Sequence, residues 1–137
     1  MKTLAEVTAA TGFEVLEHLE AEADVPVLDG LQAQGDLFVV PREGSVAHKG
    51  LMTEVPAAGI AVIEGVGGGH EHRLFASAPG TARWMAFAVP GQDIGVLECT
   101  APAYLLHPEH GATGIAPGRY VMRRQREHAD EERLVAD

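Results

Sequence analysis

The chain has 137 residues, enough for one domain and too few for two independent cores. Hydrophobic residues make up 46% of it and aromatic residues only 5%, which excludes wholesale disorder and predicts a mainly aliphatic core. The formal net charge of −10 disfavours nucleic acid as a partner, and no apolar run is long enough to span a membrane. Cys99 is the single cysteine, so an intrachain disulfide and a cysteine-based zinc site are excluded. We expect a soluble protein of the cytoplasm or of an assembled particle, with Cys99 in the core.

Residues 1–21 are expected to form an N-terminal helical arm. Thr3 can cap a helix, Glu6 follows it at the spacing of a capping box, and apolar residues recur at helical spacing. Thr11-Gly12 interrupts this pattern. The segment is therefore either one helix over 3–20 or two short helices over 3–10 and 13–21.

The remainder of the chain is predicted to contain a linker (22–34), a mostly β domain (35–128) and a charged tail (129–137). Short apolar or alternating runs, bounded by Gly and Pro, recur about every ten residues in the β domain, as in a small barrel or sandwich of about six to eight strands. The expected strands cover 37–40, 53–55, 60–64, 71–77, 82–89, 94–99, 103–107 and 119–126, with the Gly/Pro-rich segment 108–118 as a separator.

The first candidate site is the Gly-rich turn that ends in His70-Glu71-His72. On a strand, His70 and His72 point to the same face and Glu71 points to the other, because side chains alternate with period two. Two neutral imidazoles so placed can bind one transition-metal ion. The alternative is a Gly-rich hairpin loop followed by a polar strand.

A second histidine cluster lies at 107–110. If it folds beside the first, one of His107, Glu109 or His110 would complete three ligands for Zn, Mn, Fe or Ni. The alternative is a polar loop in which Pro108 sets the bend.

These segments resemble fragments of the two cupin motifs. The likeness consists of the Gly-rich turn, the His-x-His pair and the later Gly111 to Pro117 spacing. The resemblance implies a metal held inside a β-barrel. It is partial, because no Glu follows His72 at the family's spacing and Arg119–Arg124 replaces the expected third histidine.

Residues 34–128 are also similar to a group of small bacterial and phage-borne β-domain proteins without a settled activity. The shared landmarks are Gln34-Gly35-Asp36, a Gly-His-x-His turn at 69–72, a His-x-x-His-Gly segment at 107–111, and a closing strand from Pro117 to Glu127. This resemblance implies a common domain and supplies no function.

The segment Arg119 to Arg126 holds four of the ten cations. It is predicted to be a basic edge strand, which could contact phosphates. Given the acidic chain, we expect it instead to pair with acidic residues or with another copy, and edge charges also oppose aggregation.

The sequence therefore favours a non-enzymatic structural or assembly module without catalytic residues. It would act as a homo-oligomer or as a small component of a larger complex, for example a phage-derived one, with itself or another protein as partner. The alternative is a divalent-metal-binding, cupin-like protein or enzyme. Its ligands would come from His70, His72, His107 and His110.

Overall fold

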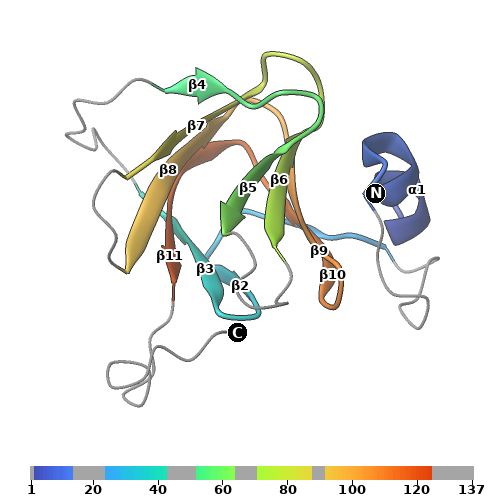
Figure 1. Ribbon diagram of the computed structural model, residues 1–137, viewed down its shortest axis with the longest axis horizontal. Helices are drawn as coiled ribbons and strands as arrows, with labels where there is room; N and C mark the ends of the chain where they lie inside the picture. The colour runs from blue at the N-terminus through green and yellow to red at the C-terminus, as the bar shows by residue number, and fades with distance from the viewer. Residues whose placement is uncertain (1, 14–23, 43–51, 64–70, 88–91, 125–137) are drawn as a thin grey trace.

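A computed structural model describes residues 2–13, 24–42, 52–63, 71–87 and 92–124. Within these ranges, eleven strands form two sheets that face each other, and one short helix lies outside one of them (Figure 1). The predicted mostly β fold with an N-terminal helix is therefore confirmed, in its sandwich form rather than as a closed barrel.

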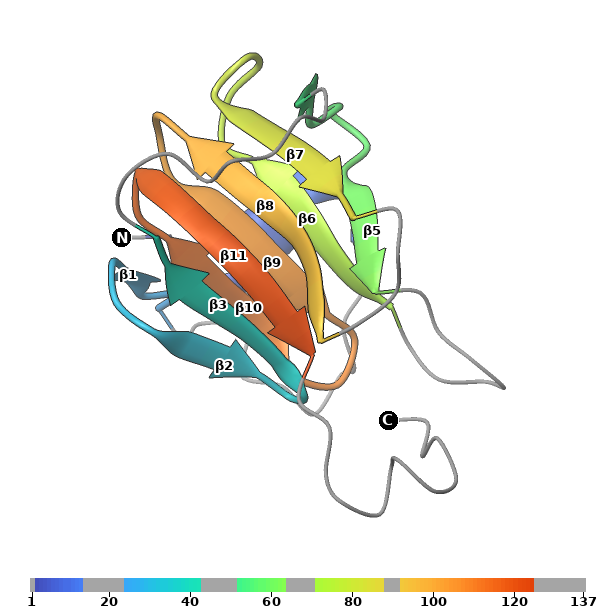
Figure 2. The same cartoon turned by 90° about the vertical axis from the view of Figure 1, so that its left-hand side faces the viewer.

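The two sheets differ in size, and all neighbouring strands are antiparallel except β1 and β10. Figure 2 shows β3, β11, β8 and β7 side by side in the larger sheet. The five-stranded sheet has the order β1 (Val27–Leu28), β10 (Gly111–Ile115), β9 (Ala103–His107), β6 (His72–Ala76) and β5 (Ile60–Ile63). The six-stranded sheet has the order β2 (Gln32–Gln34), β3 (Leu37–Pro41), β11 (Gly118–Arg124), β8 (Asp93–Cys99), β7 (Ala82–Ala86) and β4 (Thr53–Glu54).

The main core lies between the sheets and consists mostly of aliphatic side chains. Leu74 on β6 and Leu105 on β9 are fully buried there, opposite Leu97 and Met122 of the larger sheet. Cys99 belongs to the same core, as the sequence predicted, and its thiol donates to the Ala116 carbonyl oxygen. Burial raises the pKa of this thiol, which disfavours a nucleophilic role.

Helix α1 (Leu4–Thr11) has the predicted capping box between Thr3 and Glu6. It ends at Gly12, whose φ of 72° is the left-handed conformation that glycine adopts without strain. The prediction of one helix over 3–20 is therefore wrong. The alternative was two short helices, and most of the second one, residues 14–21, lies outside the described residues. In Figure 1, α1 lies on the outer side of the five-stranded sheet, away from the other sheet.

Two segments that we predicted to be irregular carry strands. The expected linker 22–34 contains β1 and β2, each of which lies at one edge of its sheet. The expected separator 108–118 contains β10, which pairs with β9 over five residue pairs despite its Gly-rich sequence. Both predictions failed because hydrogen bonding to a neighbouring strand outweighs weak intrinsic β propensity.

The basic segment forms β11, but β11 is not an edge strand. It lies between β3 and β8, and its Tyr120 and Met122 side chains are buried in the main core. Charge patterning alone suggested an edge. The three consecutive apolar residues 120–122 instead fit a central strand that is buried on both faces.

Candidate functional site: a histidine cluster at one end of the sandwich

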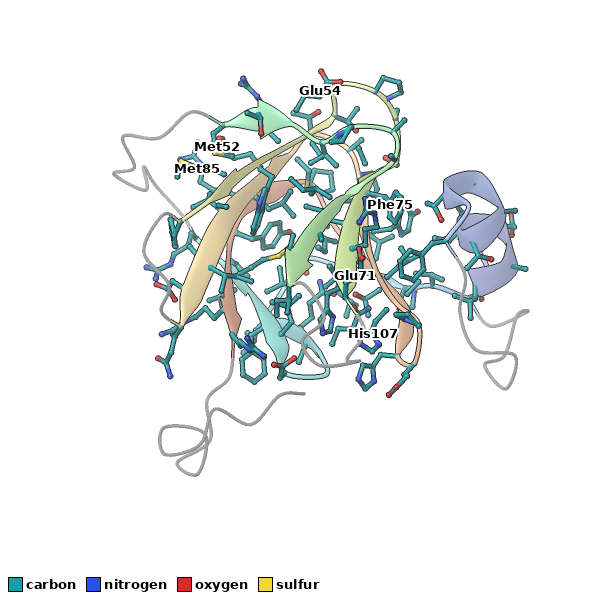
Figure 3. The ribbon with its side chains drawn as sticks, viewed as in Figure 1. Met52, Glu54, Glu71, Phe75, Met85 and His107 are labelled. Atoms are coloured by element: carbon teal, nitrogen blue, oxygen red, sulfur yellow. The ribbon has the colours of Figure 1, made fainter. Side chains whose placement is uncertain are left out.

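Three histidines from β6, from the end of β9 and from the β9–β10 turn come together at one end of the sandwich. The ring centroids of His72 and His107 are 4.4 Å apart, and His110 lies 4.5 Å from His107 and 6.4 Å from His72. Figure 3 labels His107 at this end and Glu54 at the opposite end. The two histidine segments of the sequence are thus neighbours in space. His70 lies outside the described residues.

The alternation of side chains along β6 and β9 explains why two of these imidazoles are buried. His72 precedes the core residue Leu74 by two positions, and His107 follows Leu105 by two. Both therefore belong to the inner face, where they are 3% and 6% exposed, whereas His110 is exposed. The inner face of the sandwich consequently ends in imidazoles instead of aliphatic side chains.

The β2–β3 hairpin contributes Gln34 and Asp36 to the cluster. Its two-residue turn is Gly35-Asp36, with φ of 60° at Gly35. A Cβ atom on Gly35 would lie 2.9 Å from Nε2 of His110 and 3.6 Å from Cε1 of His72. Glycine is favoured here by the positive φ of the turn, and a Cβ would also displace the His110 ring, whereas the distance to His72 is an ordinary contact.

Gln34 fixes the protonation of His72. Nε2 of Gln34 donates to the Leu105 carbonyl oxygen at 2.8 Å, and because a carbonyl only accepts, the amide oxygen must face His72. That oxygen lies 2.9 Å from Nδ1 of His72, so Nδ1 carries the proton and donates it. In the neutral imidazole, Nε2 is then an unprotonated acceptor.

His107 has the opposite arrangement. The backbone N–H groups of Glu109 and His110 donate to its Nδ1 at 3.1 and 3.3 Å. Because an N–H group can only donate, Nδ1 of His107 holds a lone pair, and the proton of the neutral ring is on Nε2. His107 therefore stabilises the turn that follows β9.

The free Nε2 of His72 faces a carboxylate. It lies 3.5 Å from Oδ1 of Asp36, whose other oxygen accepts from Nε of Arg124 at 3.1 Å. Burial, followed by repulsion from His107, lowers the pKa of His72 to about 4, although Asp36 acts in the opposite direction. At neutral pH the imidazole is uncharged, so two acceptor atoms face each other without a proton between them.

The sequence did not identify Gln34 or Asp36 as site residues, although both belong to the Gln34-Gly35-Asp36 landmark. The signal was present as a polar turn directly before a buried strand. Glu71 pairs with Arg73, and the Glu109 backbone bonds to His107. Within the described part of the chain, no group of three His, Cys, Asp or Glu side chains is preset to hold a metal ion.

The arginines of β11 pair with carboxylates, as the sequence favoured, and the partners that the structure describes lie on β8 and in the β2–β3 turn. Arg119 contacts Glu98, Arg123 contacts Asp93, and Arg124 contacts Asp36. Phosphate binding by this strand would require breaking these ion pairs, which weakens the case for nucleic acid.

No described helix is long and apolar enough to cross a membrane. No curated protein and no solved structure matches the chain. A family model does match residues 33–125, which include both histidine-bearing strands and the β2–β3 turn but exclude α1 and β1. The chain therefore belongs to the family described as a domain of unknown function, DUF8820.

Proposed function

We propose that the protein binds a divalent transition-metal ion between His72 and Asp36. The observation that carries this proposal is the 3.5 Å approach of an unprotonated imidazole nitrogen to a carboxylate oxygen in a buried position. Two facing acceptors repel each other, and a cation bound to both removes the repulsion. Zn, Mn, Fe and Ni all take this pair of ligands.

The surroundings of His72 have the form that metal-binding histidines need. Its Nδ1–H donates to Gln34, an outer contact that fixes the ring and makes Nε2 a better ligand. Among the described residues, His110 is the nearest exposed imidazole to His72, and it is the third ligand that we propose, after a change of rotamer, with water completing the coordination. His107 acts as a positioning residue, because its Nδ1 is held by backbone N–H groups.

Metal titration of the untagged, chelator-treated full chain tests the proposal. We expect one equivalent of Zn²⁺ or Co²⁺ to bind by isothermal titration calorimetry, with an absorption spectrum of bound Co²⁺. The Nε2 resonance of His72 should shift on binding. Asp36→Asn and His72→Gln should each weaken binding at least about tenfold.

Asp93→Asn is the matched control, because Asp93 is likewise paired with an arginine but belongs to β8 outside the cluster. It should leave metal affinity unchanged. Circular dichroism and thermal unfolding establish that each variant folds. The proposal is wrong if the wild-type chain binds neither metal, or if binding is the same in folded Asp36→Asn and in wild type.

A second candidate is the assembly module that the sequence favoured, for which we propose a homo-oligomer through the β1–β2 edge. Val27, Leu28 and Leu31 are 37%, 44% and 69% exposed and gather where the edge strands of both sheets meet. Exposed apolar side chains beside unpaired strand edges are typical of contacts between copies.

Light scattering over a wide concentration range tests this second candidate. A dimer or larger species is expected, and Leu31→Lys should shift it toward the monomer. Ala86→Lys is the control for added charge, because Ala86 is an exposed residue of β7, away from the β1–β2 edge. A strict monomer at every concentration would rule out self-assembly.

A further inference from the structure

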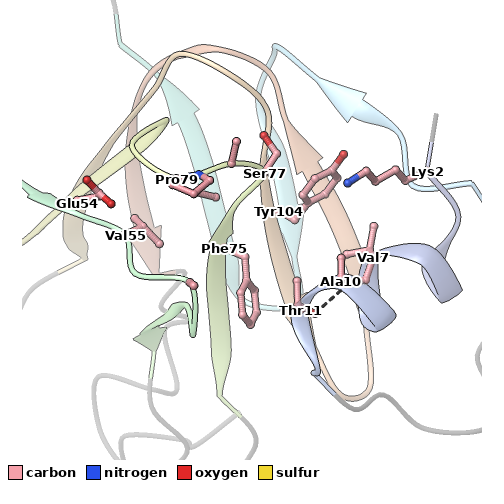
Figure 4. A pocket seen from close by; sticks show the side chains of 13 residues that line it. Lys2, Val7, Ala10, Thr11, Glu54, Val55, Phe75, Ser77, Pro79 and Tyr104 are labelled. Atoms are coloured by element: carbon pink, nitrogen blue, oxygen red, sulfur yellow. Dashed lines mark hydrogen bonds between the residues drawn. The ribbon is translucent and has the colours of Figure 1, made fainter.

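A pocket of about 280 Å³ lies between helix α1 and the outer face of the five-stranded sheet (Figure 4). None of the residues of the histidine cluster lines it. Its apolar surface comes from Val7 and Ala10 of α1, Phe75 of β6 and Val55. The volume is near the lower limit of small-molecule sites, so the pocket suits a small ligand with an apolar body.

One end of this pocket is polar. Nζ of Lys2 lies 5.7 Å from the centroid of the Tyr104 ring, and Figure 4 shows these two side chains next to each other. The Lys2 backbone is anchored, because its carbonyl oxygen accepts from the N–H group of the buried Val25 at 2.7 Å. The fold therefore fixes the backbone position from which the Lys2 side chain reaches this end of the pocket.

The Tyr104 hydroxyl is the second polar group at this end. Tyr104 is only 7% exposed, yet its hydroxyl has no hydrogen-bond partner among the described residues. The other tyrosine, Tyr120, donates to the Ala116 carbonyl oxygen at 2.7 Å. The Tyr104 side chain lines the pocket, so its hydroxyl can donate to a ligand that binds there.

Ser77 and Glu54 define the rest of the polar boundary. The Ser77 N–H donates to Pro102, two residues before Tyr104, so both side chains belong to the same face of the sheet. Glu54 lies on the other side of the pocket from Lys2 in Figure 4. A cation and two hydroxyl groups at one end suit one anion, and the carboxylate at the other end repels a second.

We propose that this pocket binds a small amphipathic monocarboxylate. The carboxylate accepts from Tyr104 and Ser77 and pairs with Lys2, while the apolar body packs on Phe75 and Val7. Binding here is independent of the metal site, since the two share no residue.

Calorimetric titration of the full chain with 4-phenylbutyrate tests the proposal, with 4-phenylbutanol and 4-phenylbutylamine as neutral and cationic probes of the same shape. Saturable binding of the carboxylate is expected, at least about fivefold tighter than the alcohol and the amine. Amide shifts of residues that line the pocket should locate the bound probe.

Three variants make the test specific. Tyr104→Phe and Lys2→Gln should each weaken binding about three- to tenfold, and Ala10→Phe should abolish it by filling the pocket. Tyr120→Phe and Arg83→Gln are matched controls outside the pocket and should bind as wild type does.

The proposal is overturned if 4-phenylbutyrate does not saturate the protein, or if the alcohol or amine binds equally well. It is also overturned if folded Tyr104→Phe and Ala10→Phe bind the carboxylate as wild type does. Thermal unfolding of each variant provides the check on folding.

Discussion

The inner and outer faces of strands β6 and β9 carry two different sites on the same pair of strands. On the inner face, Leu74 and Leu105 continue into His72 and His107, where the two sheets and the β2–β3 turn enclose the imidazoles. On the outer face, Phe75 and Tyr104 are buried in a smaller cluster under one short helix, beside the pocket. Neighbouring residues of the same strand point to opposite faces, so the buried histidine cluster and the open pocket lie on the two sides of one sheet.

The comparison shows that the burial of each site determines which kind of ligand it favours. The inner site lowers the pKa of His72 through burial, and the buried hydrogen bond to Gln34 fixes its tautomer. The outer site leaves a hydroxyl and an ammonium group at the edge of an apolar surface. The first arrangement favours a metal ion, and the second an amphipathic ligand.

The largest expected effect is the loss of stability when a packed side chain is truncated on the inner face or on the outer face of the five-stranded sheet. Leu74→Ala should lower the free energy of unfolding by about 4 kcal/mol, because the cavity forms between two sheets that cannot close it. Phe75→Ala should cost less, about 3 kcal/mol, because α1 can settle into the space. Urea denaturation measures both. An equal or larger loss at Phe75 would contradict the proposed difference in enclosure.

The pH dependence of stability tests the inner face directly. Between pH 6.5 and about 4, the unfolded chain binds a proton at His72 that the folded chain excludes, so the stability of the metal-free protein should fall as pH falls through this range. Above pH 6.5 this group has no effect. The total change is up to about 3 kcal/mol.

Denaturation of the chelator-treated protein at a series of pH values measures how the free energy of unfolding depends on pH. The His72→Gln variant should lose the contribution that His72 makes to this dependence. The same dependence in this variant would mean that other groups cause the acid sensitivity.

A smaller effect is expected from the residue that orients His72. Gln34→Ala should cost about 2 kcal/mol, because it leaves the Leu105 carbonyl and the His72 N–H without partners. The exposed Ala33→Ser on the same strand is the control. If the imidazole resonances of His72 keep their tautomer in Gln34→Ala, our account of the orientation is wrong.

The smallest expected changes in stability are those of the two Tyr→Phe variants. Tyr120→Phe should cost about 1 kcal/mol, since it removes a hydrogen bond to Ala116. Tyr104→Phe should change the stability of the ligand-free protein by no more than a few tenths of a kcal/mol. Thermal unfolding of the pair decides this, and a greater loss at Tyr104 would show that its hydroxyl is already bonded.

The sequence by itself determined the fold class and most of the long strands. Apolar runs bounded by Gly and Pro located β3, β5, β8 and β9 closely, and Thr3 with Glu6 located the start of α1. These signals are local, because capping and period-two alternation depend on a few neighbouring residues. The sequence also predicted a strand over 71–77 that includes His72, which is the first residue of β6.

Only the tertiary structure decided what lies beside these histidines. The contacts of Gln34 and Asp36 with His72 join residues 38 and 36 positions apart, and no spacing along the chain predicts which strands become neighbours. Pairing with neighbouring strands of the same sheet also makes strands of part of the expected linker and of the Gly-rich segment 111–115. The same pairing places the basic strand inside its sheet, where the sequence had predicted an edge strand. Local patterns determine which face a side chain takes, whereas long-range packing determines its partners.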